Sequence, residues 1–330
     1  MSNGASAPFG GFFPSTMLPI GFGCAWLDAR RGRALSVDLL KFALDCGVTY
    51  FDTARMYVSG AAEGILGELC SASRERMVVV SKAGILPAQN TPAIRLGRRA
   101  LRLVHKLAPH VPTPSAFVPR RAAFDVVSLR QSVETTLREL RTSYLDVLLL
   151  HQCEPQHIND ELLSLLERFR SEGKVLRYGV ATDASPALAI SQKWPQLCSV
   201  RQIPNSVWQP TLASLPVMPG LVVTHSVLGG RFRQLCRVLH DDADLRARWR
   251  ARLDLDAADP STLARLLLLH ALHANPDGVV LFSSSSKANI AKNVALARRA
   301  RDLEMTEQVA SLTALLQMHM DQARTGERAS

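Results

Sequence analysis

Short apolar runs recur along the chain, and each is bounded by turn residues and followed by a segment with helical periodicity. The runs are continuously apolar rather than alternating, which is typical of parallel strands covered on both faces. The predicted strands are Leu18–Gly23, Val48–Phe51, Met77–Ser81, Leu145–Leu150, Arg177–Ala181, Val200–Ile203, Leu221–Thr224 and Val279–Phe282. Strands separated by helices predict an α/β fold built on a parallel sheet.

The segments between the strands carry start and stop signals for helices. The expected first or capping residues are Ser36, Ser128, Asp160 and Ser261. The helix after Ser36 is expected to end at Gly47, and the helix from Asp160 at Gly173. Leu212–Leu215 predicts only a short helical turn, and Thr306–Ala323 predicts a further helix beyond the eighth strand.

The uninterrupted series of strands and helices predicts a single (β/α)8 TIM barrel over residues 1–330. An open, doubly wound sheet is the alternative. Its first turn usually carries G-x-G-x-x-G, and Gly21-Phe22-Gly23 is not followed by that spacing. We expect residues 1–16 to be a flexible lead-in, residues 83–124 an insertion after the third strand, and residues 324–330 a flexible tail.

Composition and cysteine use narrow the class of protein. Of the 330 residues, 47% are hydrophobic and 21% are charged, as in an ordinary globular protein. No apolar run approaches the roughly 20 residues of a membrane helix, and the chain start lacks the pattern of a signal peptide. The six cysteines form no C-x-x-C pair. We therefore expect a cytoplasmic protein with reduced thiols, no metal site and no membrane contact.

Most of the net charge of +10 falls in the expected insertion. This segment has seven basic residues and no acidic one, namely Arg95, Arg98, Arg99, Arg102, Lys106, Arg120 and Arg121. One helical face is apolar and comprises Ile94, Leu101, Val104 and Leu107. This pattern predicts a helix packed on the barrel rim with a solvated basic face. A lid for an acidic substrate and a docking surface for an acidic partner are the alternatives, whereas no nucleic-acid module is found.

Ionisable residues end three neighbouring predicted strands. Asp52 ends the second strand, Lys82 the third and His151 the fourth. Tyr57 lies on the loop that follows Asp52. Each residue alone has an ordinary explanation, as a turn cap, a solvated strand end or a rim histidine. Because the carboxyl ends of barrel strands meet at one rim, the four together predict an active site.

The expected chemistry of this cluster is proton transfer through Tyr57. A tyrosine pKa of about 10 is high for acid–base catalysis near neutrality, and a lysine ammonium beside the phenol lowers it. Asp52 is expected to keep Lys82 charged, and a neutral His151 to donate a hydrogen bond to a substrate oxygen. Because none of these side chains supplies a hydride, the cluster implies a redox cofactor.

Several segments resemble successive landmarks of the aldo-keto reductases. They are GFGCAW, ALDCGVTYFDTARMYVSGAAEGILGE, VVVSK, SLRQSVETTLREL, RTSYLDVLLLH, GKVLRYGVAT, RQIPNS and VVTHSVLGG. The resemblance runs in order from about Pro19 to Asn293, and D-T-x-x-x-Y followed by x5-E is specific in combination with the strand-ending lysine and histidine. It implies an NAD(P)H-dependent oxidoreductase that interconverts an aldehyde or ketone and an alcohol. The implied catalytic tetrad is Asp52, Tyr57, Lys82 and His151.

The resemblance also implies cofactor-binding positions. They are Thr182, Gln202, His225, Leu228, Gly230, Ser284, Ser286, Lys287, Asn289 and Asn293. Gln202 matches the family's partner of the nicotinamide carboxamide, whereas Ala181-Thr182 replaces the family's Ser-Asn. His225 stands where the family often stacks an aromatic ring on the nicotinamide, so it either stacks there or is a polar rim residue.

The segment FSSSSKANIAKN resembles the family's adenosine-phosphate loop. Asn293 matches a residue that contacts adenine, but Asn289 replaces the arginine often found on the 2′-phosphate. The serines and lysines of the loop can hold a phosphate at a helix N-terminus, and an ordinary serine N-cap is the alternative. The resemblance therefore implies NADP, with NAD as a further possibility.

Two other functions stay open. The pattern F-D-x-x-x-x-S-L-R-x-S-V-E-x-x-L-R-E-L resembles the branch that oxidises sugars such as fucose or galactose. A non-catalytic, cofactor-binding regulatory subunit, like the potassium-channel β subunits, shares the implied fold and cofactor. Turnover of a carbonyl or alcohol substrate separates an enzyme from such a subunit.

Overall fold

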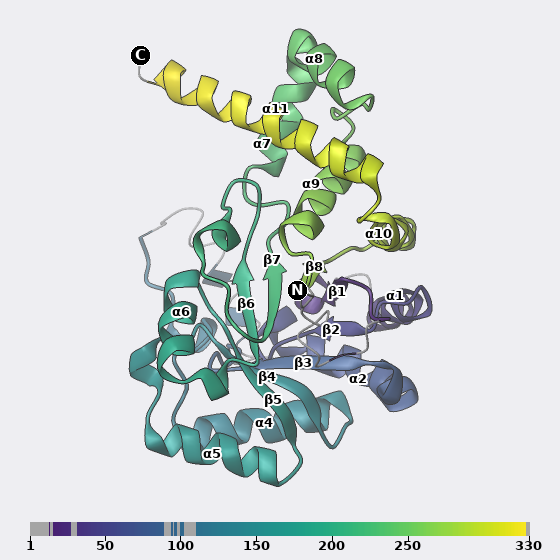
Figure 1. Cartoon of the computed structure of the whole chain (residues 1–330). Helices are drawn as coiled ribbons and strands as arrows, with labels where there is room; N and C mark the ends of the chain where they lie inside the picture. The colour runs from purple at the N-terminus through teal and green to yellow at the C-terminus, as the bar shows by residue number, and fades with distance from the viewer. Residues whose placement is uncertain are drawn as a thin grey trace, which may run out of the picture.

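The computed structural model describes residues 13, 16–27, 32–88, 94, 96–97, 100–101 and 110–327. In the described chain, eight parallel strands pair in sequence order, and β1 pairs with β8 to close the barrel (Figure 1). The strands are β1 (Ile20–Gly23), β2 (Tyr50–Asp52), β3 (Val78–Ala83), β4 (Leu145–His151), β5 (Val175–Ala181), β6 (Val200–Pro204), β7 (Leu221–His225) and β8 (Val279–Phe282). This closed parallel sheet confirms the predicted TIM barrel.

Helices surround the strands and alternate with them along the chain. They are α1 (Arg33–Asp45), α2 (Ala62–Ser73), α4 (Val126–Leu140), α5 (Asp160–Ser171), α6 (Ala184–Lys193), α9 (Pro260–Ala274) and α10 (Lys287–Arg299). Short 3-10 helices are η2 (Cys24–Trp26), η3 (Tyr57–Gly60), η4 (Arg74–Arg76), η5 (Ser115–Phe117), η6 (Pro155–His157), η7 (Pro195–Leu197) and η8 (Thr211–Ser214). The weak helical turn predicted near Leu212 is η8. No helix among the described residues is long and apolar enough to cross a membrane.

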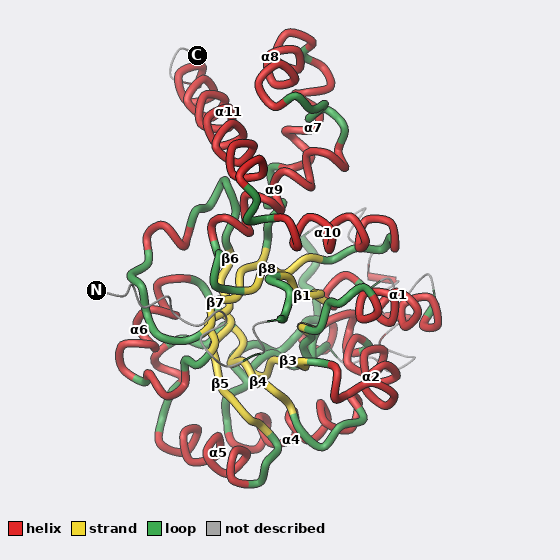
Figure 2. The backbone as a smooth tube through the Cα atoms, turned by 45° about the vertical axis from the view of Figure 1, so that its right-hand side comes forward, coloured by secondary structure: helices red, strands yellow, loops and turns green. Residues whose placement is uncertain are grey.

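Three helices in the last third of the chain stand apart from the ring. They are α7 (Phe232–Asp241), α8 (Ala243–Leu253) and α11 (Leu303–Glu327). Figures 1 and 2 show them rising together above one side of the barrel, and α11 packs against α8 and α9. The sequence predicts α11 but neither α7 nor α8. α11 continues to Glu327, so the first residues of the expected tail over 324–330 are helical, and residues 328–330 lie outside the described residues.

The expected helix starts are partly wrong. Ser36 lies inside α1, which begins at Arg33, and its hydroxyl donates to the Gly32 carbonyl at 3.4 Å. Asp125 rather than Ser128 caps α4, because its carboxylate accepts the Ser128 N–H at 2.8 Å from extended backbone. Asp259 likewise caps α9, whereas Asp160 does begin α5. An acidic cap explains the displacement at Ser128 and Ser261, whereas α1 begins after Gly32 without a side-chain cap.

The barrel interior is a separate apolar cluster from the layer between strands and helices. Its members include Phe13, Met17, Tyr50, Val78, Val80, Val147, Leu149, Val200, Leu221, Val223, Val279 and Leu281. Phe13 packs edge-on against Tyr50 with ring centroids 6.2 Å apart. Most of the expected lead-in, residues 1–16, lies outside the described residues, but Phe13 itself is buried in this interior.

The insertion begins and ends in a short antiparallel contact beside β3. Leu86 and Arg120 exchange backbone hydrogen bonds of 2.9 and 3.1 Å. Gly84 has φ +112°, and a Cβ there would lie 2.4 Å from the Phe124 ring, so this turn requires glycine. Of the seven basic residues, Arg120 and Arg121 are described and the other five lie outside the described residues. The proposed apolar helix face is described only at Ile94 and Leu101, so the role of the insertion stays a prediction.

Candidate functional site

Alternation along the strands brings polar side chains into the barrel at one rim. Side chains two residues apart on a strand point to the same face. On five strands, a polar residue follows an interior residue by two positions. The pairs are Tyr50 and Asp52, Val80 and Lys82, Leu149 and His151, Val200 and Gln202, and Val223 and His225. These five polar residues all line one cavity. The predicted gathering of strand-ending residues at one rim is thus what the geometry shows.

A buried ion pair forms the base of this site. The Lys82 Nζ lies 2.5 Å from Asp52 Oδ1 and donates to the Thr53 carbonyl at 3.0 Å. Both side chains are almost fully buried, with 1% and 3% exposed for Lys82 and Asp52. Burial opposes the ammonium form, but Asp52 and Tyr57 outweigh it and raise the pKa of Lys82. Lys82 is therefore held charged, as its pairing with Asp52 predicts.

Tyr57 lies directly above this pair. The Lys82 Nζ is 4.7 Å from the centroid of the Tyr57 ring, and the His151 ring stands perpendicular to it with centroids 6.1 Å apart. Burial raises the pKa of Tyr57 above its ordinary value and outweighs Lys82, which lowers it. The expected net lowering of this pKa is wrong, although the lysine acts in the expected direction. Desolvation of the phenolate is the stronger effect here.

His151 is neutral near pH 7. Burial is the largest cause, followed by Lys82 and His225, and together they lower the pKa of His151 to about 3. Its Nδ1 is buried and has no hydrogen-bond partner among the described residues. A neutral imidazole that lines the cavity can orient a substrate oxygen, and this role of His151 stays a prediction.

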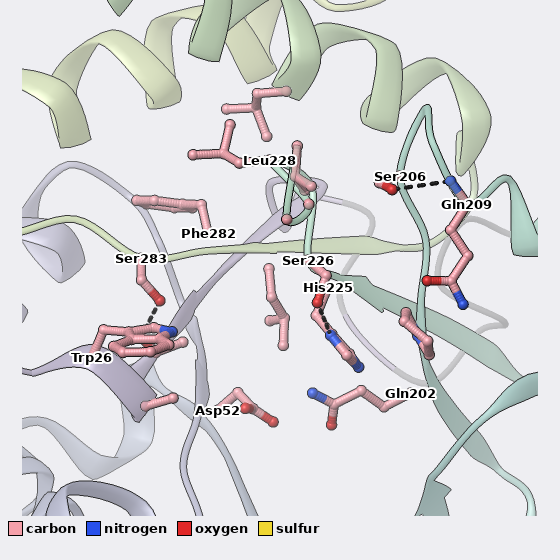
Figure 3. A pocket seen from close by; sticks show the side chains of 18 of the residues that line it. Trp26, Asp52, Gln202, Ser206, Gln209, His225, Ser226, Leu228, Phe282 and Ser283 are labelled. Atoms are coloured by element: carbon pink, nitrogen blue, oxygen red, sulfur yellow. Dashed lines mark hydrogen bonds between the residues drawn. The ribbon is translucent and has the colours of Figure 1, made fainter. Parts of the chain in front are cut away.

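The cavity has a volume of about 1650 Å³, well above the usual range of about 300–1,000 Å³ for small-molecule pockets. It extends from the ion pair to the facing sides of α9 and α10. Predicted cofactor positions that line it are Thr182, Gln202, His225, Leu228, Gly230, Ser284, Asn289 and Asn293. Figure 3 shows His225 and Gln202 extending into the space beside Asp52. The structure therefore brings most of the predicted cofactor residues to one cavity.

Ser286 and Lys287 do not line this cavity. The Ser286 side chain caps α10 by accepting the Asn289 N–H at 3.4 Å. Lys287 turns toward α1, where its Nζ lies 2.6 Å from Asp38 Oδ2 and 5.4 Å from the centre of the Phe42 ring. The ordinary helix-cap interpretation of this loop thus fits Ser286, and the phosphate-binding role predicted for Lys287 has no geometric support.

Two charged residues lie at the α9–α10 end of the cavity: Lys292, which was predicted with the serine- and lysine-rich loop, and Arg265, which was not predicted. Arg265 on α9 and Lys292 on α10 both line it, near Asn289 and Asn293. Arg265 has no ion-pair partner within the part of the chain that the structure describes. Asp259, the N-cap residue of α9, is an acid that lines the same end, and its pKa is lowered chiefly by hydrogen bonds from Thr262 and to a smaller extent by Lys292. In the sequence, Arg265 could have been noticed as the single arginine within the apolar stretch that begins at Leu263.

Aromatic residues near the cavity mouth were also missed. Trp26 and Trp208 line it, and Trp26 is 83% exposed. Trp208 packs against Gly229, where a Cβ would lie 2.8 Å from its ring. Arg121, at the end of the insertion, lines the same region and donates to the Gln152 side chain. Nothing in the local sequence pattern distinguishes these residues from surface residues, because loop closure brings them to the rim.

Buried polar atoms in the cavity wall offer contacts to a bound group. Gln202 is 3% exposed, and its Oε1 has no hydrogen-bond partner among the residues described here. A buried acceptor without a partner is costly unless a ligand or water satisfies it. Gln202 therefore fits the amide N–H₂ of a nicotinamide carboxamide. Across the described residues, no group of three histidine, cysteine or acidic side chains forms a candidate metal site.

A closed barrel with a buried lysine–aspartate pair, a tyrosine and a histidine at one rim is an arrangement typical of barrel oxidoreductases. The model of the aldo/keto reductase family matches residues 19–210. The chain belongs to this family.

Similar proteins agree with that assignment. A methylglyoxal reductase of Escherichia coli is 28% identical over 154 residues, which is 47% of this chain and 41% of the relative. A D-threo-aldose 1-dehydrogenase of a Pseudomonas species is 33% identical over 177 residues, 51% of each chain. The chain thus spans about half of the length of these relatives or less.

Solved structures share the fold along most of the chain. An aldo-keto reductase of Bacillus halodurans, in its holo form, superposes with a TM-score of 0.63 at 19% identity, covering 90% of this chain and 91% of that one. An aldo-keto reductase of Klebsiella pneumoniae in complex with NADPH gives 0.60 at 22% identity, covering 89% and 90%. At these identities the likeness concerns the fold.

Proposed function

We propose that this chain is an NADP(H)-dependent oxidoreductase that interconverts an aldehyde or ketone and the corresponding alcohol. The observation that carries the proposal is the buried Lys82–Asp52 ion pair directly below the Tyr57 ring, inside a cavity of about 1650 Å³. Lys82 supplies a fixed positive charge beside the phenol, and His151 supplies a neutral nitrogen on its other side. Proton transfer at Tyr57 is the chemistry that this arrangement serves best.

Each of the four residues has a defined task in the proposed reaction. Tyr57 donates its proton to the substrate oxygen in reduction and accepts it in oxidation. Lys82, held charged by Asp52, stabilises the phenolate that remains after donation. His151 orients the substrate oxygen toward Tyr57. A bound nicotinamide supplies or accepts the hydride.

The cavity wall supports a nicotinamide dinucleotide as the cofactor. Gln202 would hold the carboxamide, and Asn293 and Ser284 would lie along the adenosine part. Arg265 and Lys292 would provide positive charge for a 2′-phosphate in place of the arginine absent at Asn289. The family relative of known structure with NADPH bound supports the same choice. We therefore expect NADP to bind more tightly than NAD, by a moderate margin.

Oxidation of a sugar is the second candidate. It is supported by the relative named D-threo-aldose 1-dehydrogenase, which is 33% identical over its matched segment. The pKa of Tyr57, raised above its ordinary value mainly by burial, keeps the phenol protonated at neutral pH and does not decide between the two directions. A panel of aldehydes, ketones and sugars, assayed in both directions, separates the two candidates. Absence of turnover with every member would favour the cofactor-binding regulatory subunit instead.

The assignment of Tyr57 is tested by Tyr57→Phe, with Tyr144→Phe as the matched control. Tyr144 lies just before β4 and outside the cavity, beneath the Arg74 guanidinium at 3.9 Å. Loss of the general acid should lower kcat by about 10²–10⁴-fold, while cofactor affinity changes by less than about twofold. Tyr144→Phe should retain activity. Near-normal kcat in Tyr57→Phe would reject the proposed proton donor.

A further inference from the structure

Glu63 is a fully buried acid that the proposed proton transfer does not use. It lies in the first turn of α2 and is the glutamate that closes the D-T-x-x-x-Y-x5-E motif. Its exposure is 0%. A buried carboxylate without partners is strongly unfavourable, so its partners define its role.

Three elements meet at this carboxylate. Arg55 Nη1 lies 2.6 Å from Glu63 Oε2, and the Arg55 side chain is 13% exposed. The Ser81 hydroxyl donates to Oε1 at 2.6 Å, and the Thr136 hydroxyl from α4 donates to the same atom at 2.8 Å. Glu63 therefore connects the β2–α2 loop, β3 and α4 through direct side-chain contacts.

Two of these partners adjoin residues of the site. Arg55 lies two residues before Tyr57 in the same loop, and Ser81 directly precedes Lys82 on β3. The loop also contains Val58 and Ser59 with φ of 52° and 55°, a left-handed conformation that non-glycine residues rarely adopt. Such backbone persists only where the surroundings hold it in place. The Arg55–Glu63 contact is the ion pair that anchors this loop in the described structure.

We propose that Glu63 and Arg55 are positioning residues that hold the Tyr57 hydroxyl at a fixed position relative to the Lys82 ammonium group. The proposal rests on the proposed proton-transfer role of Tyr57. Glu63 holds the loop through Arg55 and the strand through Ser81, so one carboxylate sets the distance between the phenol and the ammonium. A misplacement of about 1 Å at a reacting centre can cost about 10²-fold in rate.

The structure offers a matched control ion pair at the other end of the barrel. Arg74 Nη2 lies 2.7 Å from Asp146 Oδ2, with 13% and 15% of the two side chains exposed. Asp146 Oδ2 also accepts the Val79 N–H at 2.8 Å, so it ties a helix end to β3 as Glu63 does. Glu63→Gln and Asp146→Asn make the same chemical change, a carboxylate to its amide, at opposite ends of the strands.

The first experiment compares kinetics and stability of the two variants. Glu63→Gln should lower kcat by about 10- to 100-fold, with cofactor Kd unchanged within about twofold. Asp146→Asn should lose comparable stability in urea and retain kcat within about twofold. Equal kinetics in the two variants would make Glu63 an ordinary structural acid and overturn the proposal.

The second experiment needs no turnover and so separates this proposal from the proposed function. The pKa of Tyr57 is followed by the ¹³Cζ resonance of labelled tyrosine, with Tyr57→Phe identifying the signal. Because burial is the main cause that raises this pKa, a loosened loop in Glu63→Gln should bring the pKa down toward its ordinary value of 10. An unchanged Tyr57 titration in Glu63→Gln would overturn the positioning role, whether or not a substrate is found.

Substitutions at Arg55 keep the test decisive if Glu63→Gln does not fold. The Arg55 side chain is 13% exposed, whereas that of Glu63 is fully buried, so Arg55 is the more accessible member of the pair. Arg55→Gln should reproduce the loss of kcat and the downward shift of the Tyr57 pKa, whereas Arg55→Lys, which keeps the charge, should restore most of both. Identical behaviour of Arg55→Gln and Arg55→Lys would contradict an ion-pair mechanism.

Discussion

Residues 19–210 and residues 211–327 both line one cavity, and they hold their charged side chains differently. The first part, which the family model matches, carries Lys82 and Asp52 as a nearly unexposed pair inside the barrel. The second part carries Lys287 on a helix, paired with Asp38 with about half of each side chain exposed. Its Arg265 and Lys292 lie on helix faces that line the cavity.

This difference determines how freely the position of a charged residue can change in each part. A charge buried inside the barrel depends on one partner at one distance, so the strands that place both are tightly constrained. A charge on a helix face is hydrated, and a phosphate can be reached from more than one helix position. In the proposed function, the cofactor end would therefore use an arginine at position 265 in place of one at position 289, whereas the four residues around the buried ion pair leave no such choice of position.

The largest expected effect compares these two ion pairs. Lys82→Met leaves the Asp52 carboxylate buried without its partner, and this should lower the free energy of unfolding by about 3–5 kcal/mol. Lys287→Met removes an exposed pair and should cost less than about 1 kcal/mol. Urea denaturation of both variants measures the difference. If both variants lost a similar amount of unfolding free energy, the buried and the exposed ion pair would not differ in their contribution to stability.

An intermediate effect concerns one histidine from each part. Burial is the main cause that lowers the pKa of His151 to about 3 and that of His225 to about 4. Because both folded values lie below the unfolded value of about 6.5, the unfolded state binds more protons as the pH falls. Stability should therefore be highest above pH 6.5, and by pH 5 each histidine should have removed about 2 kcal/mol.

Single variants assign this acid sensitivity. The stability lost between pH 7 and pH 5 should shrink by about 2 kcal/mol in His151→Gln and by the same amount in His225→Gln. Below pH 4, only His151 should continue to contribute. The exposed His240 on α7 provides the control substitution. An unaltered pH profile in either cavity variant would show that its imidazole is not held neutral by burial.

The smallest expected effect concerns the 2′-phosphate. Arg265→Ala should weaken NADP binding by about tenfold, or about 1.4 kcal/mol, and leave NAD binding unchanged. Lys287→Met, on the first residue of α10 but turned toward Asp38, should change neither affinity. Fluorescence titration with both cofactors measures this. Equal loss of NADP and NAD affinity in Arg265→Ala would place the arginine outside the phosphate subsite.

The polar strand ends of the candidate site were predictable from two local patterns: the apolar run that marks each strand, and the alternation of side chains between the two faces of a strand. An apolar run marks each strand, and the residue two positions beyond a buried interior residue faces the same side. This places Asp52, Lys82 and His151 at one rim. The net pKa of Tyr57 was not predictable, because it depends on how completely the loop buries the phenol, and local sequence does not give that burial.

The sequence by itself determined the succession of strands and the closure into a barrel, because the apolar runs and the helical segments between them are spaced regularly along the chain. It also predicted that Asp52, Lys82 and His151 meet at one rim. Only the tertiary structure decided that Glu63 joins Arg55, Ser81 and Thr136, that Lys287 turns away from the cavity and that Arg265 enters it. These contacts join side chains that lie far apart in the sequence. Which of them meet depends on how the helices and strands pack, and a local sequence pattern does not contain that information.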